Sequence, residues 1–292
     1  MPLSGVDPLS PGDARVVTPS TGAGWPLAPC RGAGRGCSWV RGSGRSGGIV
    51  GSLLVVVGAS GGVGASSLAT AVAVRAARAS LGAVLVDGCP VGGGLDVVLG
   101  AEQERGVRWS DLSRLEGSAD GPALLVRLPS AEGVRVLSFG RDGAEPSEDV
   151  ARAVVTALVA ECALVVVDAD AAGGSVASAA LAAADGVLVV AGDGMSQLSA
   201  LSVVSGLLAA GSGRIGVVMA VCLRGPSSTA GPVARVVESE LRWPVLCVLE
   251  DDRVMAGDSV RGVPPGTRDH GSTVRAADVV LGWTVLDGRG IE

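Results

Sequence analysis

Valine-rich runs alternate with alanine-rich stretches along most of this chain. The valine-rich runs predict strands at residues 53–58, 83–87, 134–138, 163–168, 187–191, 215–221 and 245–249. Between them, helices are predicted at 66–80, 147–161, 175–184, 196–210 and 229–241. Apolar strands that alternate with helices form a parallel sheet with helices on both faces. The sequence therefore predicts an α/β fold with a doubly wound, mostly parallel sheet.

The first fifty residues differ from the rest. Residues 1–50 are rich in Pro, Gly, Ser and Arg and show almost no apolar periodicity, which is typical of a segment that cannot bury enough apolar surface to fold. We expect 1–50 to be a low-complexity, disordered arm and 51–292 to be a single domain. The arm is basic, so the acidic excess of the chain, net charge −6, lies in the domain. Because phosphate contacts need clustered basic residues, we expect no specific nucleic-acid partner.

Cysteine spacing and hydropathy bear on metals and membranes. The six cysteines include no CxxC pair and His270 is the single histidine, so we expect neither zinc nor an iron–sulfur cluster. Residues 46–74 carry no charge, but their glycine- and serine-rich middle lacks the large apolar side chains of a membrane span. The stretch 272–286 has too few basic residues for membrane insertion. We predict a cytoplasmic protein that reaches a membrane or septum only through a partner.

A glycine-rich turn follows the first predicted strand. Residues 58–67 read GASGGVGASS, and loops of this kind turn successive backbone N–H groups around phosphates. A phosphate loop also uses a lysine, whereas this chain contains no lysine and has Ala65 at that position. The sequence predicts the backbone cradle of a P-loop without its charge. The predicted nucleotide-binding residues are Ser60, Gly61, Gly62, Val63, Gly64, Ala65, Ser66 and Ser67.

Two acidic turns complete the candidate site. Asp87 ends the second predicted strand and Asp168 ends the fourth. Open α/β sheets bind ligands outside the carboxyl ends of their strands, so we expect these turns to converge on the glycine loop. Asp168 would reach Mg²⁺ together with the Ser66 hydroxyl, as a Walker B aspartate does. The alternative is an aspartate that only caps the turn after its strand.

A second interpretation of the glycine loop is a dinucleotide site. Gly58, Gly61 and Gly64 spell GxxGxxG, and Asp87 follows Gly64 by 23 residues, where a ribose-binding carboxylate would stand. However, the chain has no Tyr or Lys for short-chain dehydrogenase chemistry. The roughly fifty residues before the loop are too few for the catalytic domain of a medium-chain reductase. An NAD(P)-binding oxidoreductase is therefore kept as an alternative function.

The order of the motifs resembles a known family. GASGGVGASS, LVDGCPVGGGLDVVLG, LVVVDAD and AADGVLVVAG are together similar to the Min/Par group of deviant Walker A ATPases. RWSDL at 108–112, VLSFGRD at 136–142 and RGVPPG at 261–266 resemble its actinobacterial CpaE-like branch, which includes septum-site-determining proteins. The resemblance covers about 51–268. It implies an ATP-controlled positional protein for division or for pilus and secretion machinery, which works with partner proteins and as a homodimer on a membrane or nucleoid surface.

The same resemblance identifies three departures from the family pattern. The signature lysine that reaches the partner's nucleotide aligns with Ser60, and the Walker lysine aligns with Ala65. In the switch region, the aspartate that handles the attacking water aligns with Cys89, two residues after Asp87. Charge-assisted contacts contribute about 1.5–3 kcal/mol each, so the loss of two lysines should weaken binding of ATP or ADP with Mg²⁺ by roughly 10²–10⁴-fold. Hydrolysis should suffer more.

We therefore expect a pseudo-ATPase whose nucleotide binding is weak or vestigial, and no residue is assigned a catalytic role. The predicted function is a spatial regulator or scaffold of septum placement, and the alternative within the same family is a slow ATPase that positions pilus or secretion machinery. Two further features are assigned to packing and to the surface. Trp109 is predicted in the core rather than as a partner anchor, and Arg224, Arg235 and Arg242 are expected on a solvated surface.

Overall fold

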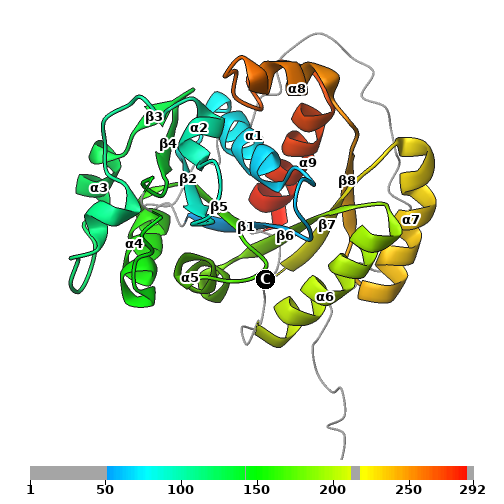
Figure 1. Ribbon diagram of the computed structural model, residues 1–292, viewed down its shortest axis with the longest axis horizontal. Coiled ribbons are helices and arrows are strands. Elements are labelled where there is room, and N and C mark those ends of the chain that lie inside the picture. The colour runs from blue at the N-terminus through cyan, green and yellow to red at the C-terminus, as the bar shows by residue number, and fades with distance from the viewer. Residues whose placement is uncertain (1–50, 142, 212–217, 288–292) are drawn as a thin grey trace, which may run out of the picture. The chain divides into compact units, whose positions relative to one another are not determined.

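A mostly parallel sheet forms the centre of the fold in the computed structural model, which describes residues 51–141, 143–211 and 218–287 (Figure 1). The described sheet has eight strands in the order β3-β4-β2-β5-β1-β6-β7-β8. All neighbouring strands are parallel except β3, which is antiparallel to β4. The strands are β1 (Ser52–Gly58), β2 (Ala83–Gly88), β3 (Ser130–Ala131), β4 (Val134–Leu137), β5 (Leu164–Ala169), β6 (Gly186–Gly192), β7 (Val218–Arg224) and β8 (Val245–Leu249).

Helices cover both faces of this sheet, as Figure 1 shows. Helices α1, α2 and α9 pack on one face, and α4, α5, α6 and α7 pack on the other. The doubly wound architecture expected from the sequence is therefore confirmed. The helices are α1 (Ala65–Arg78), α2 (Leu95–Leu99), α3 (Gly121–Arg127), α4 (Glu148–Glu161), α5 (Ser175–Ala183), α6 (Met195–Gly211), α7 (Ser227–Leu241), α8 (Arg253–Val260) and α9 (Ser272–Asp287), with a 3₁₀ turn η1 (Trp109–Leu112).

The central strands are buried on both sides, which is why they read as continuous apolar runs. In β1, Leu53 and Val55 face the helix layer that contains α4, while Leu54 and Val56 face the layer that contains α1 and α9. All four side chains are fully buried. Each contributes roughly 1.5–3 kcal/mol of hydrophobic stabilisation relative to an exposed position. The strand therefore holds the turn at its carboxyl end, Gly58, in a fixed place.

Several short elements were not predicted from the sequence. They are β3, α2, η1, α3 and α8, each too short to show a clear helical or strand period. Two of these helices begin at a local hydrogen bond instead. The Asp120 carboxylate accepts the backbone N–H of Ala123 at the start of α3, and the Asp252 carboxylate accepts two N–H groups at the start of α8. Of the predicted strand 215–221, residues 215–217 lie outside the described residues, and the described strand continues three residues further, to Arg224.

Strand order brings the predicted site turns together. Strand β5 lies between β1 and β2 and is parallel to both, which confirms the expected pairing of the first and fourth predicted strands. Asp87 on β2 is directly opposite Asp168 on β5. In the usual dinucleotide-binding sheet the first two strands are neighbours, so the order observed here favours the phosphate-loop interpretation.

Two expectations concern regions beyond this sheet. The arm at 1–50 lies outside the described residues, and its disorder stays a prediction. Among the helices that the structure describes, none has the length and apolar character needed to cross a membrane.

Candidate nucleotide-binding site

The glycine loop connects β1 to α1 with its backbone donors open. Gly62 and Gly64 have φ values of 76° and 92°, a region that glycine enters without strain. The first helical bond of α1 runs from Leu68 N–H to the Gly64 carbonyl at 2.9 Å. Within the described chain, no acceptor is recorded for the N–H groups of residues 61–67, and α1 has neither a side-chain cap nor an acidic residue in its first turn. This arrangement suits an anion.

Ser60 gives a second indication that the loop suits a phosphate. Its Oγ is buried and has no hydrogen-bond partner in the described part of the protein. An unsatisfied buried hydroxyl costs about 1–3 kcal/mol, and a phosphate oxygen in the loop would satisfy it. A Cβ built on Gly61 or Gly62 would meet no atom within 4 Å, so the loop is open on that side. The loop therefore fits a phosphate by shape and by hydrogen bonding, but Ser60 and Ala65 bring no charge.

Asp168 and Ser66 meet beside this loop, as the sequence predicted. The Asp168 side chain is only 3% exposed, and it forms a hydrogen bond with the Ser66 side chain. Burial raises the pKa of Asp168 to about 7, the hydrogen bond with Ser66 opposes this shift, and the charges of Asp87 and Asp170 add to it. A buried carboxylate beside a hydroxyl could hold Mg²⁺ with water and phosphate oxygens as the other ligands. No cluster of three or more His, Cys, Asp or Glu ligands occurs in the described residues.

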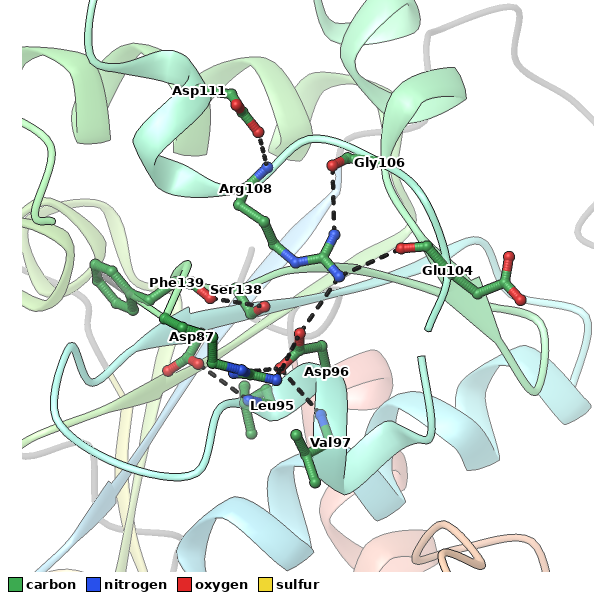
Figure 2. Close-up of polar contacts among 11 residues, drawn as sticks. Asp87, Leu95, Asp96, Val97, Glu104, Gly106, Arg108, Asp111, Ser138 and Phe139 are labelled. Carbon is green, nitrogen blue, oxygen red and sulfur yellow. Dashed lines mark hydrogen bonds and ion pairs between the residues drawn. The ribbon is translucent and has the colours of Figure 1, made fainter. Parts of the chain in front are cut away.

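Asp87 organises the turn after β2 (Figure 2). Its carboxylate oxygens accept the backbone N–H groups of Cys89 at 3.1 Å and Leu95 at 3.0 Å. Burial raises the pKa of Asp87 to about 6, although these two hydrogen bonds oppose the shift. Since both oxygens bind the turn itself, Asp87 shapes the switch region and is not free to hold a ribose. This observation also disfavours the dinucleotide interpretation.

Cys89, which the family resemblance aligns with the switch aspartate, is a neutral thiol. Its Sγ lies 3.8 Å from the backbone carbonyl oxygen of Asp168 and donates a weak hydrogen bond to it. Burial, followed by the negative charges of Asp168, Asp87 and Asp170, raises the pKa of the Cys89 thiol far above its usual value. A thiol that stays protonated at physiological pH cannot accept a proton from a water molecule.

An ion cluster that the sequence did not indicate stabilises the other side of the switch turn. The Asp96 carboxylate is 3% exposed and pairs with Arg108 at 3.3 Å and Arg141 at 3.4 Å. Figure 2 shows the Arg108 guanidinium between Asp96 and the carbonyls of Glu104 and Gly106. Arg141 of this cluster also lines a cavity of about 200 Å³, together with Asp87 and Cys89. The three charges come from three separate motifs of the sequence, at 85–100, 108–112 and 136–142, and only the fold shows that they meet.

Arg224 reaches the glycine loop from the carboxyl end of β7. Its Nη1 donates a hydrogen bond of 2.6 Å to the Gly62 carbonyl, and its Nε and Nη2 bind Asp251 at 3.1 and 2.9 Å. Arg224 is only partly exposed and does not lie on a solvated helix surface as expected, because the carboxyl end of β7 lies beside the glycine loop. Arg235 and Arg242 are exposed as expected.

The strand order of the sheet and the glycine loop between β1 and α1 are those of the P-loop NTPase fold. The chain is similar to the septum site-determining protein MinD of Pyrococcus horikoshii in complex with Mg-ADP, with a TM-score of 0.63 and 17% identity over 82% of this chain and 97% of that one. A ParA family ATPase of Chlorobium tepidum gives a TM-score of 0.62 and 16% identity over 80% and 98%. A chain of the MinC:MinD cell division protein complex of Aquifex aeolicus gives a TM-score of 0.62 and 17% identity over 79% of this chain and 96% of that one. These likenesses show the MinD/ParA fold.

A sequence relative adds a narrower likeness. The chain is 35% identical over 194 residues to the uncharacterized protein Rv3660c of Mycobacterium tuberculosis (strain H37Rv), a match that covers 66% of this chain and 53% of the relative. The chain thus spans about half the length of the curated relatives it matches. No protein family model matches the chain.

Proposed function

We propose that this protein is a spatial regulator or scaffold of cell division that acts in septum-site determination through a degenerate MinD/ParA-type site. One observation supports this proposal most directly. The glycine loop offers open backbone N–H donors to a phosphate, but the side chains at 60 and 65 in the loop, and at 89 in the neighbouring turn, are neutral. The MinD and ParA folds of its structural neighbours support a positional role. The CpaE-like motifs at 108–112, 136–142 and 261–266 support the septal one.

The residues of this site are suited to bind a nucleotide but not to hydrolyse it. Bound ATP with Mg²⁺ would bring the γ-phosphoryl group and the divalent charge. The N–H groups of the loop and the Ser60 hydroxyl would bind phosphate oxygens, and Ser66 with Asp168 would hold the cation. At Cys89 no carboxylate is available to orient water or take its proton. Weak binding without efficient hydrolysis follows from this combination.

A partner protein is part of the proposal. MinD of Aquifex aeolicus was solved with MinC, and a scaffold without turnover would likewise act through proteins that it recruits. We propose partners from the division machinery and a homodimer as the working form. Pilus or secretion partners are the alternative, which would assign the same fold to a slow positioning ATPase.

Two measurements test the proposal. Phosphate release by the purified full-length chain with Mg-ATP should stay at background in the presence and absence of lipid vesicles. A fluorescent fusion of the chain should gather at division sites, and depletion of the protein should change septum spacing. Hydrolysis at a rate typical of MinD and ParA proteins would overturn the pseudo-ATPase proposal. Normal septum spacing after depletion would contradict the septal role, and in that case loss of pili or secretion would favour the alternative.

A further inference from the structure

We propose that Arg224 supplies the positive charge of the phosphate loop that lysine provides in other P-loops. This inference rests on the proposed nucleotide site and adds a binding residue to it. Arg224 lies more than 150 residues after the loop in the sequence, yet its Nη1 is 2.6 Å from the Gly62 carbonyl oxygen. A Cβ built on Gly64 would lie 3.5 Å from the same nitrogen. The guanidinium therefore lies directly against the loop.

The loop itself provides no full positive charge for a phosphate. Residues 58–67 contain no charged side chain, and open N–H groups alone carry only partial charges. A guanidinium stays protonated at all physiological pH values and binds phosphate oxygens through planar pairs of N–H donors. An arginine at position 65 itself would crowd the loop, whereas one that enters from β7 leaves the cradle open.

Two other arginines lie near the site but not at the glycine loop. Arg108 and Arg141 share the buried carboxylate of Asp96 on the switch side of the site, and within the described residues neither donates a hydrogen bond to the loop. Arg224 instead pairs with Asp251, whose side chain is 81% exposed. An exposed ion pair contributes little free energy, so Arg224 can exchange its contact with Asp251 for one with a phosphate at small cost, while the hydrogen bond from Nη1 to Gly62 keeps the guanidinium at the loop. The Arg224 side chain is itself 34% exposed and accessible to a ligand in the loop.

The charge role and a purely structural role make different predictions. As a structural brace, Arg224 would hold Gly62 in place with Asp251 as its anchor, and loss of either residue would harm the loop. If Arg224 instead provides positive charge for a bound phosphate, Asp251 weakens phosphate binding, because its carboxylate offsets the charge of the guanidinium. Removal of Asp251 should then strengthen the binding of a polyanion.

Titration of the full-length protein with Mg-ATP and Mg-ADP, by calorimetry and by thermal shift, tests this proposal. Arg224→Ala should weaken binding by about tenfold or more, Arg224→Lys should weaken it less, and Asp251→Asn should strengthen it. Arg235→Ala is the matched control, since Arg235 is exposed on α7, and it should change affinity less than about twofold. In an Ala65→Lys background, Arg224→Ala should have a smaller effect, because the lysine then carries the charge.

Several results would overturn the inference. One is a loss of affinity in Arg224→Ala that is no larger than in Arg235→Ala, and another is an equal loss of affinity with and without Lys at position 65. Weaker binding by Asp251→Asn, or no binding by the unmodified protein, would also overturn it.

Measurements of affinity and of turnover separate this inference from the proposed function. Rapid hydrolysis that depends on Arg224 would support the inference and reject the pseudo-ATPase, whereas background hydrolysis with unchanged affinity in Arg224→Ala would do the reverse.

Discussion

The indole nitrogen of Trp109 donates a hydrogen bond of 2.9 Å to the backbone carbonyl of Asp87. Trp109 is fully buried and lies beside Phe139, with ring centroids 6.3 Å apart. The predicted core position of Trp109 is thus confirmed. The contact also gives the RWSDL motif a physical role, because it connects η1 to the residue whose carboxylate shapes the switch turn.

Trp109→Phe should lower the free energy of unfolding by about 2–4 kcal/mol. The change leaves the Asp87 carbonyl without this donor, at about 1–3 kcal/mol, and removes part of a large buried ring. Urea denaturation measures the loss. Trp283→Phe is the control, since the Trp283 indole makes no hydrogen bond in the described residues and is only half-buried. Equal losses for the two variants would contradict a specific role for the indole N–H.

The raised pKa of Asp87 predicts how stability depends on pH. Between the ordinary carboxyl value of 3.8 and about 6, the folded protein holds a proton on Asp87 that the unfolded chain has lost. Stability from this group is complete below the unfolded pKa and is lost as the pH rises through the folded pKa. A shift of about two units corresponds to roughly 3 kcal/mol. Asp168, with a pKa of about 7, contributes with the same sign.

The variant Asp87→Asn isolates this contribution. Without divalent cations, the unfolding free energy of the unmodified protein should fall between pH 5 and pH 8, and the fall should be smaller in Asp87→Asn. Urea denaturation at both pH values provides the comparison. The variant also loses one acceptor for the turn, so its absolute stability should be lower, and the slope is the informative quantity. Identical slopes would show that Asp87 does not titrate in this range.

The sequence predicted the strands and long helices because their side chains carry the period of the element. Val55 and Val56 are buried on opposite faces, and no local alternative competes with that burial. The convergence of Ser66 and Asp168 was also predictable, because it follows from parallel strands alone. In contrast, the contact between Arg224 and Gly62 and the cluster around Asp96 depend on tertiary packing of segments distant in the chain. Arg224 looks like an ordinary surface charge in the sequence, and no spacing rule pairs Asp96 with Arg108 and Arg141.

Gly266, in the RGVPPG motif, should tolerate no side chain. Its φ is 89°, and an added Cβ would lie 2.9 Å from the backbone of Ala71 on α1. Gly266→Ala should therefore cost about 1–2 kcal/mol for the left-handed backbone and about 1–3 kcal/mol more for the clash. Gly262→Ala is a matched control, because Gly262 has a φ of 71° but open space around it. If thermal and urea unfolding show the same cost for both variants, the close approach to α1 is not important for stability.

The three neutral positions predict a stepwise recovery of ATP chemistry. Ala65→Lys should strengthen binding of Mg-ATP by about tenfold or more, because a charge-assisted contact to phosphate is added to a cradle that is already shaped. It should leave hydrolysis weak while Cys89 stays a neutral thiol. The double variant Ala65→Lys with Cys89→Asp should raise turnover above either single variant. The new carboxylate adds negative charge near Asp87 and Asp168, so this variant should be less stable than the parent without Mg²⁺ and recover when Mg²⁺ is added.

Ala65→Gln, of similar length without charge, is the control in calorimetry and phosphate-release assays. If Ala65→Gln improves binding as much as Ala65→Lys does, or if the double variant gains no turnover, missing charge is not what limits this site.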